Sequence, residues 1–107
     1  RKGGVMLGRF CIVRSRDQGV VCGVVEAASG RCVHLTDARQ IHGWSGESNT
    51  LFEAAHRGLG EARISEPVAE MWMLEACGVI PCTPEAEANL RESRWNANYS
   101  GSASTRR

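Results

Sequence analysis

The sequence predicts an α+β fold, in which an antiparallel β-sheet of four or five strands, arranged as a meander, carries two short helices. Three short runs rich in β-branched residues come first and are separated by brief turns. Two later segments begin with residues that cap helices. The length of 107 residues suits a single domain.

The three strands of the meander are expected at residues 9–14, 20–27 and 31–36. The first two are rich in valine and isoleucine, and the third alternates polar with apolar residues, as a half-buried strand does. The turns between them contain Asp, Ser and Gly, which favour tight reversals of the chain. Gly23, inside the second strand, indicates a bulge or a close approach of another backbone.

The middle of the chain gives weaker signals. Residues 37–48 show no periodicity and are expected to form an irregular connection. A strand is expected at 63–65, and it should be brief because Pro67 ends it. The apolar run at 68–80 fits helix or strand by periodicity, and its missing caps favour a strand.

The first helix is expected at residues 51–57. Thr50 and Glu53 form the capping box that starts such a helix, and Gly58 follows it at the position where helices commonly stop. Its expected apolar face consists of Leu51, Phe52, Ala55 and Leu59.

The second helix is expected to start at Pro84, with Thr83 as its cap, and to run to about residue 94 or 95. Residues 96–107 are rich in Ser, Asn and Gly and are expected to be a disordered tail. Residues 1–8 are expected to be an N-terminal extension. The single α+β domain would therefore span residues 9–95.

Charge and hydropathy exclude several classes of protein. The net charge is +1, and 12 of the 13 basic residues are Arg. Nucleic-acid binding is therefore disfavoured, because nucleic-acid binders usually carry a basic excess. No apolar run reaches the roughly 18 residues of a membrane span, and the start lacks a secretory signal. These features favour a cytoplasmic protein.

Five cysteines occur, an odd number, and most lie within apolar or alternating stretches. We therefore expect reduced, structural thiols, no disulfide and no metal site. The pair Cys77 and Cys82 lacks a second Cys/His pair at zinc-finger spacing and is expected in the core.

No catalytic motif is present. The chain has neither the G-x-S-x-G pattern of a nucleophilic serine nor a glycine-rich phosphate loop. We therefore expect a non-enzymatic binding protein, with no catalytic residue and no cofactor, and leave a hydrolase as a remote alternative.

The candidate ligand site lies in residues 37–50. This segment gathers a guanidinium, an imidazole, an indole, hydroxyls and glycines just before a helix N-terminus. Such groups suit a phosphate or carboxylate together with a stacked base. The candidate ligand-binding residues are Arg39, Trp44, Ser45, Asn49 and Thr50.

The same segment also fits a purely structural turn. In that interpretation Trp44 packs in the core and Arg39 pairs with Asp37 or Glu47. The sequence leaves both interpretations open.

Several short stretches resemble a family of small, uncharacterised proteins of tailed bacteriophages and prophages. Its members carry "IVR", then "ARxLWYWSGA-SL", then "IIPxT" before the last helix. In place of the Arg, Trp and Tyr usual in that family, this chain has Gln40, His42 and Gly43, so Trp44 alone remains of the aromatic cluster. The matching stretches are Cys11-Ile12-Val13-Arg14, Ala38-Arg39, Trp44-Ser45-Gly46, Thr50-Leu51 and Val79-Ile80-Pro81-Cys82-Thr83.

The resemblance implies a phage or prophage accessory protein acting in the cytoplasm of a host bacterium. Small phage proteins of this kind often antagonise host defence, and we expect this one to bind a small anionic, nucleotide-like ligand. The alternative is a protein–protein inhibitor or assembly factor that takes no small ligand.

A homodimer is a further expectation. Residues 71–74, Met-Trp-Met-Leu, are densely apolar for a domain with one small core. A two-fold interface is the commonest way to cover such an excess. The alternative is that all four side chains fit within the core of one molecule.

Overall fold

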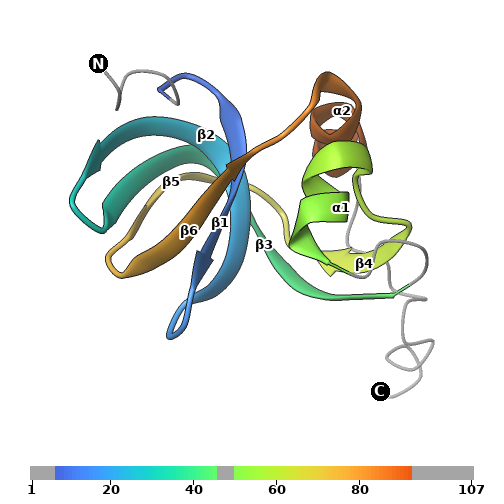
Figure 1. The fold of residues 1–107 in the computed structure, drawn as a ribbon, viewed down its shortest axis with the longest axis horizontal. Helices are drawn as coiled ribbons and strands as arrows, with labels where there is room; N and C mark the ends of the chain where they lie inside the picture. Colours follow the sequence, from blue (N-terminus) through green and yellow to red (C-terminus); the bar gives the residue numbers. More distant parts are fainter. Residues whose placement is uncertain (1–6, 46–49, 93–107) are drawn as a thin grey trace.

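The fold is an antiparallel sheet with two helices, seen in a computed structural model that describes residues 7–45 and 50–92. Six strands form one sheet, and the helices lie together at one end of it (Figure 1). The elements in chain order are β1 (Phe10–Ser15), β2 (Gly19–Ser29), β3 (Cys32–Ser45), α1 (Leu51–Arg57), β4 (Glu61–Ile64), β5 (Val68–Met73), β6 (Ala76–Pro81) and α2 (Pro84–Glu92).

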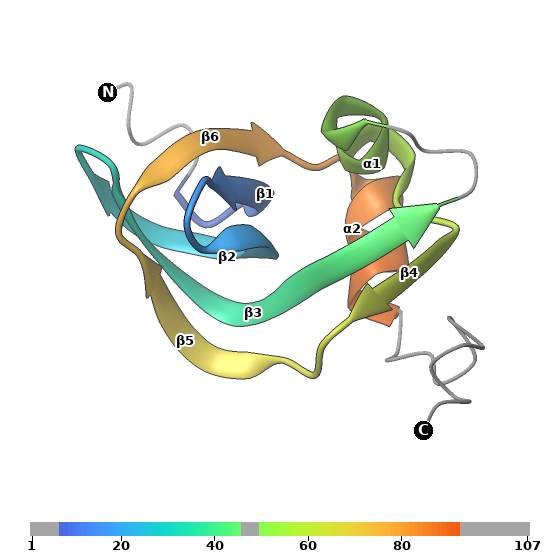
Figure 2. The ribbon, with the colours of Figure 1, turned by 90° about the horizontal axis from the view of Figure 1, so that it is seen from below.

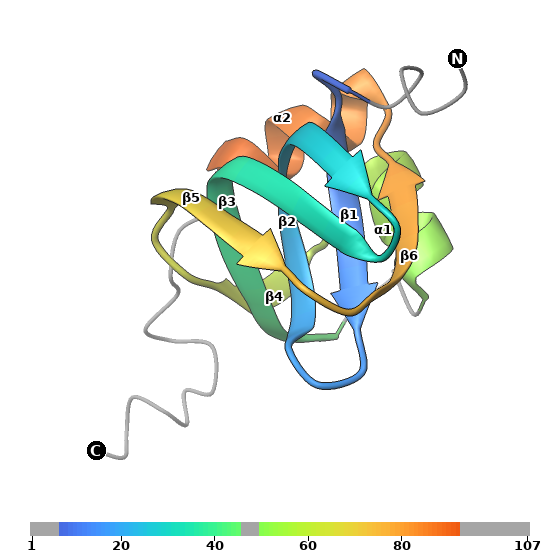
Figure 3. The same cartoon turned by 90° about the vertical axis from the view of Figure 1, so that its left-hand side faces the viewer.

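The sheet curls into a half-open barrel. Its order is β4-β3-β2-β1-β6. The long strand β3 has two partners on its outer edge: β5 pairs with its first half and β4 with its second half. Because β5 and β6 lie at opposite sides of the sheet yet follow each other in the chain, the sheet must bend to bring them together (Figure 2). Figure 3 shows the same curl from the barrel's own end.

The two faces of the sheet bury two separate cores, because neighbouring strand residues point to opposite faces. The inner face fills the barrel, with Val13, Leu35 and Met73 fully buried. The outer face is covered by the helices, where Ile12 and Leu90 are fully buried in a second cluster. The fold therefore has a barrel core and a helix-covered core that share one sheet.

Thr83 joins the two helices. Its hydroxyl donates to the carbonyl of His56 at 2.6 Å and accepts from the N–H of Ala86 at 3.1 Å, which caps α2. Asn89 adds a second link, because its Oδ1 accepts from the N–H of Leu59 at 2.9 Å. The exit from α1 is thereby fixed against α2.

Gly58→Ala is expected to lower the free energy of unfolding by about 2 kcal/mol. Gly58 has φ of 89°, where side chains are strained, and an added Cβ would lie 2.3 Å from Oδ1 of Asn89. Thermal unfolding of this variant tests the value. Gly60→Ala is the control, because a Cβ there meets nothing within 4 Å. Equal melting temperatures for the two variants would contradict the prediction.

The predicted meander and both helix starts are confirmed, and the close approach expected at Gly23 is present. A Cβ on Gly23 would lie 3.0 Å from the backbone of both Ala38 and Thr36, where the β2–β3 register shifts. Of the expected apolar face of α1, however, Phe52 is exposed. On so short a helix the residues facing the sheet are Ala54 and Ala55, and Phe52 is turned away.

The prediction of an irregular connection at 37–48 is wrong for residues 37–45, which belong to a strand. The third strand does not stop at Thr36 but continues to Ser45, because Asp37 adopts a positive φ of 52° that lets the strand bend and go on. β4 then pairs with this second half. Residues 46–48 lie outside the described residues.

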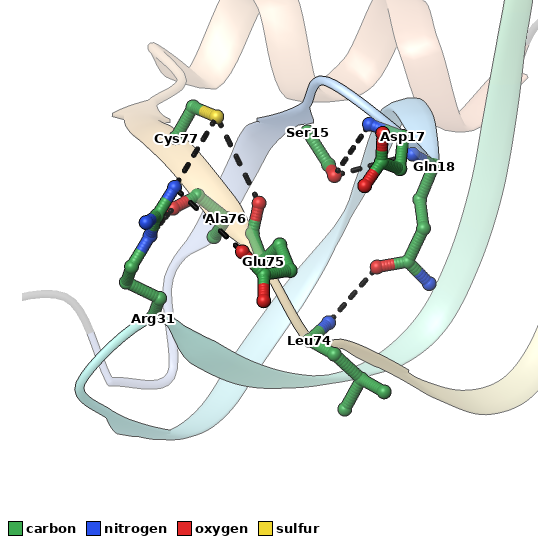
Figure 4. Close-up of polar contacts among 8 residues, drawn as sticks. All are labelled: Ser15, Asp17, Gln18, Arg31, Leu74, Glu75, Ala76 and Cys77. Atoms are coloured by element: carbon green, nitrogen blue, oxygen red, sulfur yellow. Dashed lines mark hydrogen bonds and ion pairs between the residues drawn. The ribbon is translucent and has the colours of Figure 1, made fainter.

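The single strand expected at 68–80 is also wrong. The chain reverses at Leu74 and Glu75, and the run forms two strands, which raises the strand count to six. Side chains from other turns bind this reversal: Gln18 Oε1 accepts from the N–H of Leu74 at 2.9 Å, and Arg31 contacts Glu75 and Cys77 (Figure 4). These tertiary contacts have no local signature in the sequence.

The cysteines are free thiols, but they do not all lie in the core. Cys11, Cys22 and Cys82 are buried, as expected of small hydrophobes. Cys77 is exposed, so its expected place in the core is wrong. It lies on β6, an end strand of the sheet, beside the exposed Arg31.

The expected limits of the domain are only partly covered. Residues 1–6 of the N-terminal extension and the whole tail at 96–107 lie outside the described residues. The second helix is described as far as Glu92. The run at 71–74 is divided, since Met73 is buried while Trp72 and Leu74 are exposed.

Candidate functional site

Arg39, the first of the candidate ligand-binding residues, is tied into the fold. Its Nε donates to the carbonyl of Ser65 at 2.8 Å, and its Nη1 donates to the carbonyls of Leu90 and Arg91 at 3.0 Å each. The last carbonyls of a helix have no partner within the helix. The guanidinium of Arg39 therefore serves the end of α2 and does not pair with Asp37, which binds Arg91 instead.

The other candidate residues follow along the same segment. Thr50 is the N-cap of α1, and its hydroxyl accepts from the N–H of Glu53 at 3.2 Å. The backbones of Trp44 and Ser45 lie in β3, opposite Ala62 and Glu61 of β4. The side chains of Trp44 and Ser45, and all of Asn49, lie outside what the structure describes.

Arg39 and Thr50 do not line the same hollow. Arg39 lies beside a cavity of about 480 Å³ at the mouth of the barrel, with Gln18 and Met71. Thr50 borders a different, open groove of about 1050 Å³. A strand rises about 3.3 Å per residue, so residues close together in sequence are carried far apart along β3.

The groove beside Thr50 is the strongest candidate site in the described part of the chain. Its floor is a row across the sheet, with Val20 and Gly78 opposite Arg14 on either side. This row lies on the face of the sheet that the helices cover, next to the N-terminal end of α1. The wall is formed by Leu51 and Phe52 of the helix.

Because Gly78 is a glycine and has no side chain, it helps to keep the groove open. A Cβ built on Gly78 meets no atom within 4 Å, so the space above this part of β6 is empty. The groove continues past Phe52 into a shallow hollow of about 350 Å³ that shares Phe52 and Ile80 with it. Phe52, which is 77% exposed, thus stands as an aromatic ridge between the two.

Two arginines give the groove its charge. Arg14 and Arg16 are both exposed and line it, and neither has an ion-pair or hydrogen-bond partner among the described residues. The turn that carries Arg16 is held by Ser15, whose hydroxyl accepts from the N–H groups of Asp17 and Gln18 at 3.2 Å each (Figure 4). An apolar groove with two unpaired guanidinium groups suits an anion that also has an apolar part.

Sequence reasoning missed these groove residues. Arg14 did carry a signal, because it is the one charged residue in the run that forms β1, and a charged side chain is rarely buried. Phe52 and Gly78 carried none, because an aromatic residue in a helix usually packs inward and a strand glycine usually marks a bulge. Only the folded arrangement of β1, β6 and α1 brings the three side by side.

The buried thiols do not suit catalysis. Burial raises the pKa of Cys22 from 9.0 to about 12, and it raises the pKa of Cys82 to about 12 as well. A nucleophilic cysteine needs a lowered pKa, so these two thiols serve packing.

Two further searches of the described residues are negative. No group of three or more His, Cys, Asp or Glu side chains is placed to hold a metal ion. No helix there is both long and apolar enough to cross a membrane.

Comparison with known proteins places the chain in a family. No curated protein and no solved structure matches it. A family model described as a domain of unknown function, DUF6948, matches residues 8–90, which include every strand and most of α2. The chain therefore belongs to the DUF6948 family.

Proposed function

We propose that this protein is a non-enzymatic binding module whose groove takes a small anionic, nucleotide-like ligand. The observation that carries the proposal is the pair of unpartnered arginines, Arg14 and Arg16, beside the apolar groove under Phe52. Guanidinium groups bind phosphate and carboxylate through two parallel hydrogen bonds, and arginine is more weakly hydrated than lysine.

The size and composition of the groove support this class of ligand. Its volume of about 1050 Å³ is at the upper end of small-molecule sites, which is suitable for a dinucleotide or a nucleotide sugar. Phe52 offers a largely free aromatic face for a base, and base–aromatic stacking contributes about 1–3 kcal/mol. Arg14 and Arg16 would then hold the phosphates at the other end.

The proposed ligand accords with the phage or prophage setting that the sequence resemblance implies. In that setting, a protein that sequesters a nucleotide signal would antagonise host defence without catalysing a reaction. Compared with the site expected from sequence, the proposal keeps Thr50 at the edge of the site. Arg14 and Arg16 replace Arg39, and Phe52 replaces Trp44 as the stacking residue.

A thermal-shift screen of cyclic dinucleotides and ADP-ribose derivatives tests the proposal. A ligand present at 100 times its Kd stabilises the folded state by about 2.7 kcal/mol. For a domain of this size that corresponds to a rise in melting temperature of roughly 10 °C or more. A protein–protein inhibitor without a small ligand would show no rise with any compound of the panel.

Two groove variants and one control locate the binding. Arg14→Ala with Arg16→Ala should abolish the ligand-induced rise while leaving the melting temperature of the free protein within about 2–4 °C. Gly78→Val should also abolish it, because the valine fills open space on a strand that favours β-branched residues. Arg57→Ala removes an exposed arginine outside the groove lining and should change nothing. A ligand shift that survives both groove variants would place its site elsewhere.

A further inference from the structure

The end strand β5 is exposed in a way that the proposed groove does not explain. Among the described residues it pairs with β3 alone, which leaves its other edge without a strand partner. Trp72 points away from the barrel, opposite His34, whereas Met71 and Met73 pack with the barrel core. Trp72 is 49% exposed, Leu74 in the turn after the strand is 61% exposed, and Val68 at the start of the strand is 52% exposed.

Trp72 is held as a platform. The ring of His34, opposite it on β3, stacks on the indole with centroids 4.3 Å apart and planes 10° from parallel. His34 Nε2 lies 2.8 Å from Oε1 of Glu70, which fixes the imidazole. One face of the indole is thus covered by His34, and the exposed half of Trp72 is free for a partner.

The charge around this platform is negative. Glu70 is 52% exposed and lies two residues before Trp72, on the same face of β5. Glu26 lies nearby on β2, accepting from the hydroxyl of Thr36, the residue opposite Glu70. In the described part of the chain, no Lys or Arg forms an ion pair with either carboxylate. A cation placed over the free face of Trp72 would gain the aromatic face and the carboxylate of Glu70.

The free edge of β5 already forms hydrogen bonds of the kind a strand would supply. The amide of Gln18 bridges two backbone groups there, accepting from the N–H of Leu74 at 2.9 Å and lying 3.5 Å from the carbonyl of Trp72. Towards Val68 the edge continues beside the cavity of about 480 Å³, which Val21, Val68 and Met71 line together. This cavity is open to apolar side chains that alternate with those over Trp72.

We propose that β5 binds an extended, basic segment of a partner protein as a further strand, whose main chain replaces the side-chain amide of Gln18 at this edge. Main-chain hydrogen bonds supply affinity in this mode, and alternate side chains supply specificity. Arg or Lys side chains of the segment lie over the free face of Trp72 beside Glu70, and its apolar side chains enter the barrel-mouth cavity. This site uses no residue of the groove, so it stands whether or not the groove binds a nucleotide-like ligand.

A second copy of the chain is the competing occupant, as in the homodimer expected from residues 71–74. Edge-to-edge pairing of two β5 strands brings the Glu70 carboxylates of both copies to one seam, and like charges facing each other destabilise a strand pair. The charge of Glu70 therefore favours a basic partner over a second copy.

Two synthetic peptides test the proposal on the full-length protein. TRVRVT places arginines on one face of a strand and valines on the other, and TEVEVT replaces the arginines with acids. Titrations followed by ¹H–¹⁵N NMR should show shifts at the amides of β5 and the indole of Trp72. TRVRVT should bind at least about tenfold more tightly than TEVEVT, because like charges oppose the acidic peptide.

Glu70→Lys should weaken binding of TRVRVT at least about fivefold and reduce its dependence on salt. Glu85→Lys, the same change at an exposed position on α2, should leave the affinity unchanged. Equal affinity for both peptides, or shifts confined to the groove, would overturn the proposal. So would β5 shifts that depend on protein concentration without peptide, because they would assign the edge to a second copy.

Discussion

Arg39→Ala is expected to lower the free energy of unfolding by about 3 kcal/mol. The substitution removes three hydrogen bonds from a charged donor to the carbonyls of Ser65, Leu90 and Arg91. The carbonyls of Leu90 and Arg91 lie in the last turn of α2, where they have no hydrogen-bond partner within the helix. Since each kcal/mol corresponds to roughly 4–8 °C in a domain of this size, thermal unfolding should show a drop of about 15 °C.

Arg39→Lys separates the structural role from charge alone. Lysine keeps the positive charge but lacks the planar fork that reaches several carbonyls at once, so most of the lost stability should remain lost. Arg14→Ala is the matched control, because it removes an exposed arginine with no partner among the described residues. An Arg39→Ala protein that melts with the parent would show that Arg39 is available for a ligand after all.

Raising the pH above about 9 is expected to destabilise the fold steeply. Burial raises the pKa of Cys22 and of Cys82 from 9.0 to about 12, so both thiols stay protonated in the folded protein while those of the unfolded chain ionise. The unfolded state then binds fewer protons, and stability falls as the pH rises. The contribution is fully present below pH 9 and is lost progressively as the pH rises towards 12.

Circular dichroism melts between pH 7 and 11 measure this loss. Cys22→Ala and Cys82→Ala should each remove the slope of one thiol, although both variants lose some packing and melt lower at neutral pH. Cys77→Ala is the control, because Cys77 is exposed and should leave the slope unchanged. Parallel pH profiles for all three variants would disprove the assignment to the buried thiols.

Local signals predicted those parts of the fold whose cause is local. The helix α1 begins after Thr50 and ends before Gly58, as predicted, because capping depends on a few neighbouring backbone groups. The β-branched runs in β1 and β2 and the alternation at the start of β3 predicted the meander for the same reason. The strand count was low because β4 and the β5–β6 reversal depend on partners elsewhere in the chain.

The candidate site shows the same division. Sequence reasoning gathered Arg39 and Thr50 because they lie eleven positions apart, but the folded chain places them beside separate hollows. The groove instead joins Arg14, Phe52 and Gly78, which come from three distant elements. No spacing rule links these residues, because the pairing of β6 with β1 sets Gly78 beside Arg14 and the packing of α1 adds Phe52.

The sequence by itself determined the class of fold, the first three strands and the start of each helix. Each of these depends on periodicity or capping within about a dozen residues. The tertiary structure alone decided that Arg39 serves the end of α2, that β3 continues past Asp37, and that Trp72 faces outward while Met73 faces the core. These outcomes depend on which surfaces meet when the sheet curls, and pairing between distant strands leaves no mark in the residues of either strand alone.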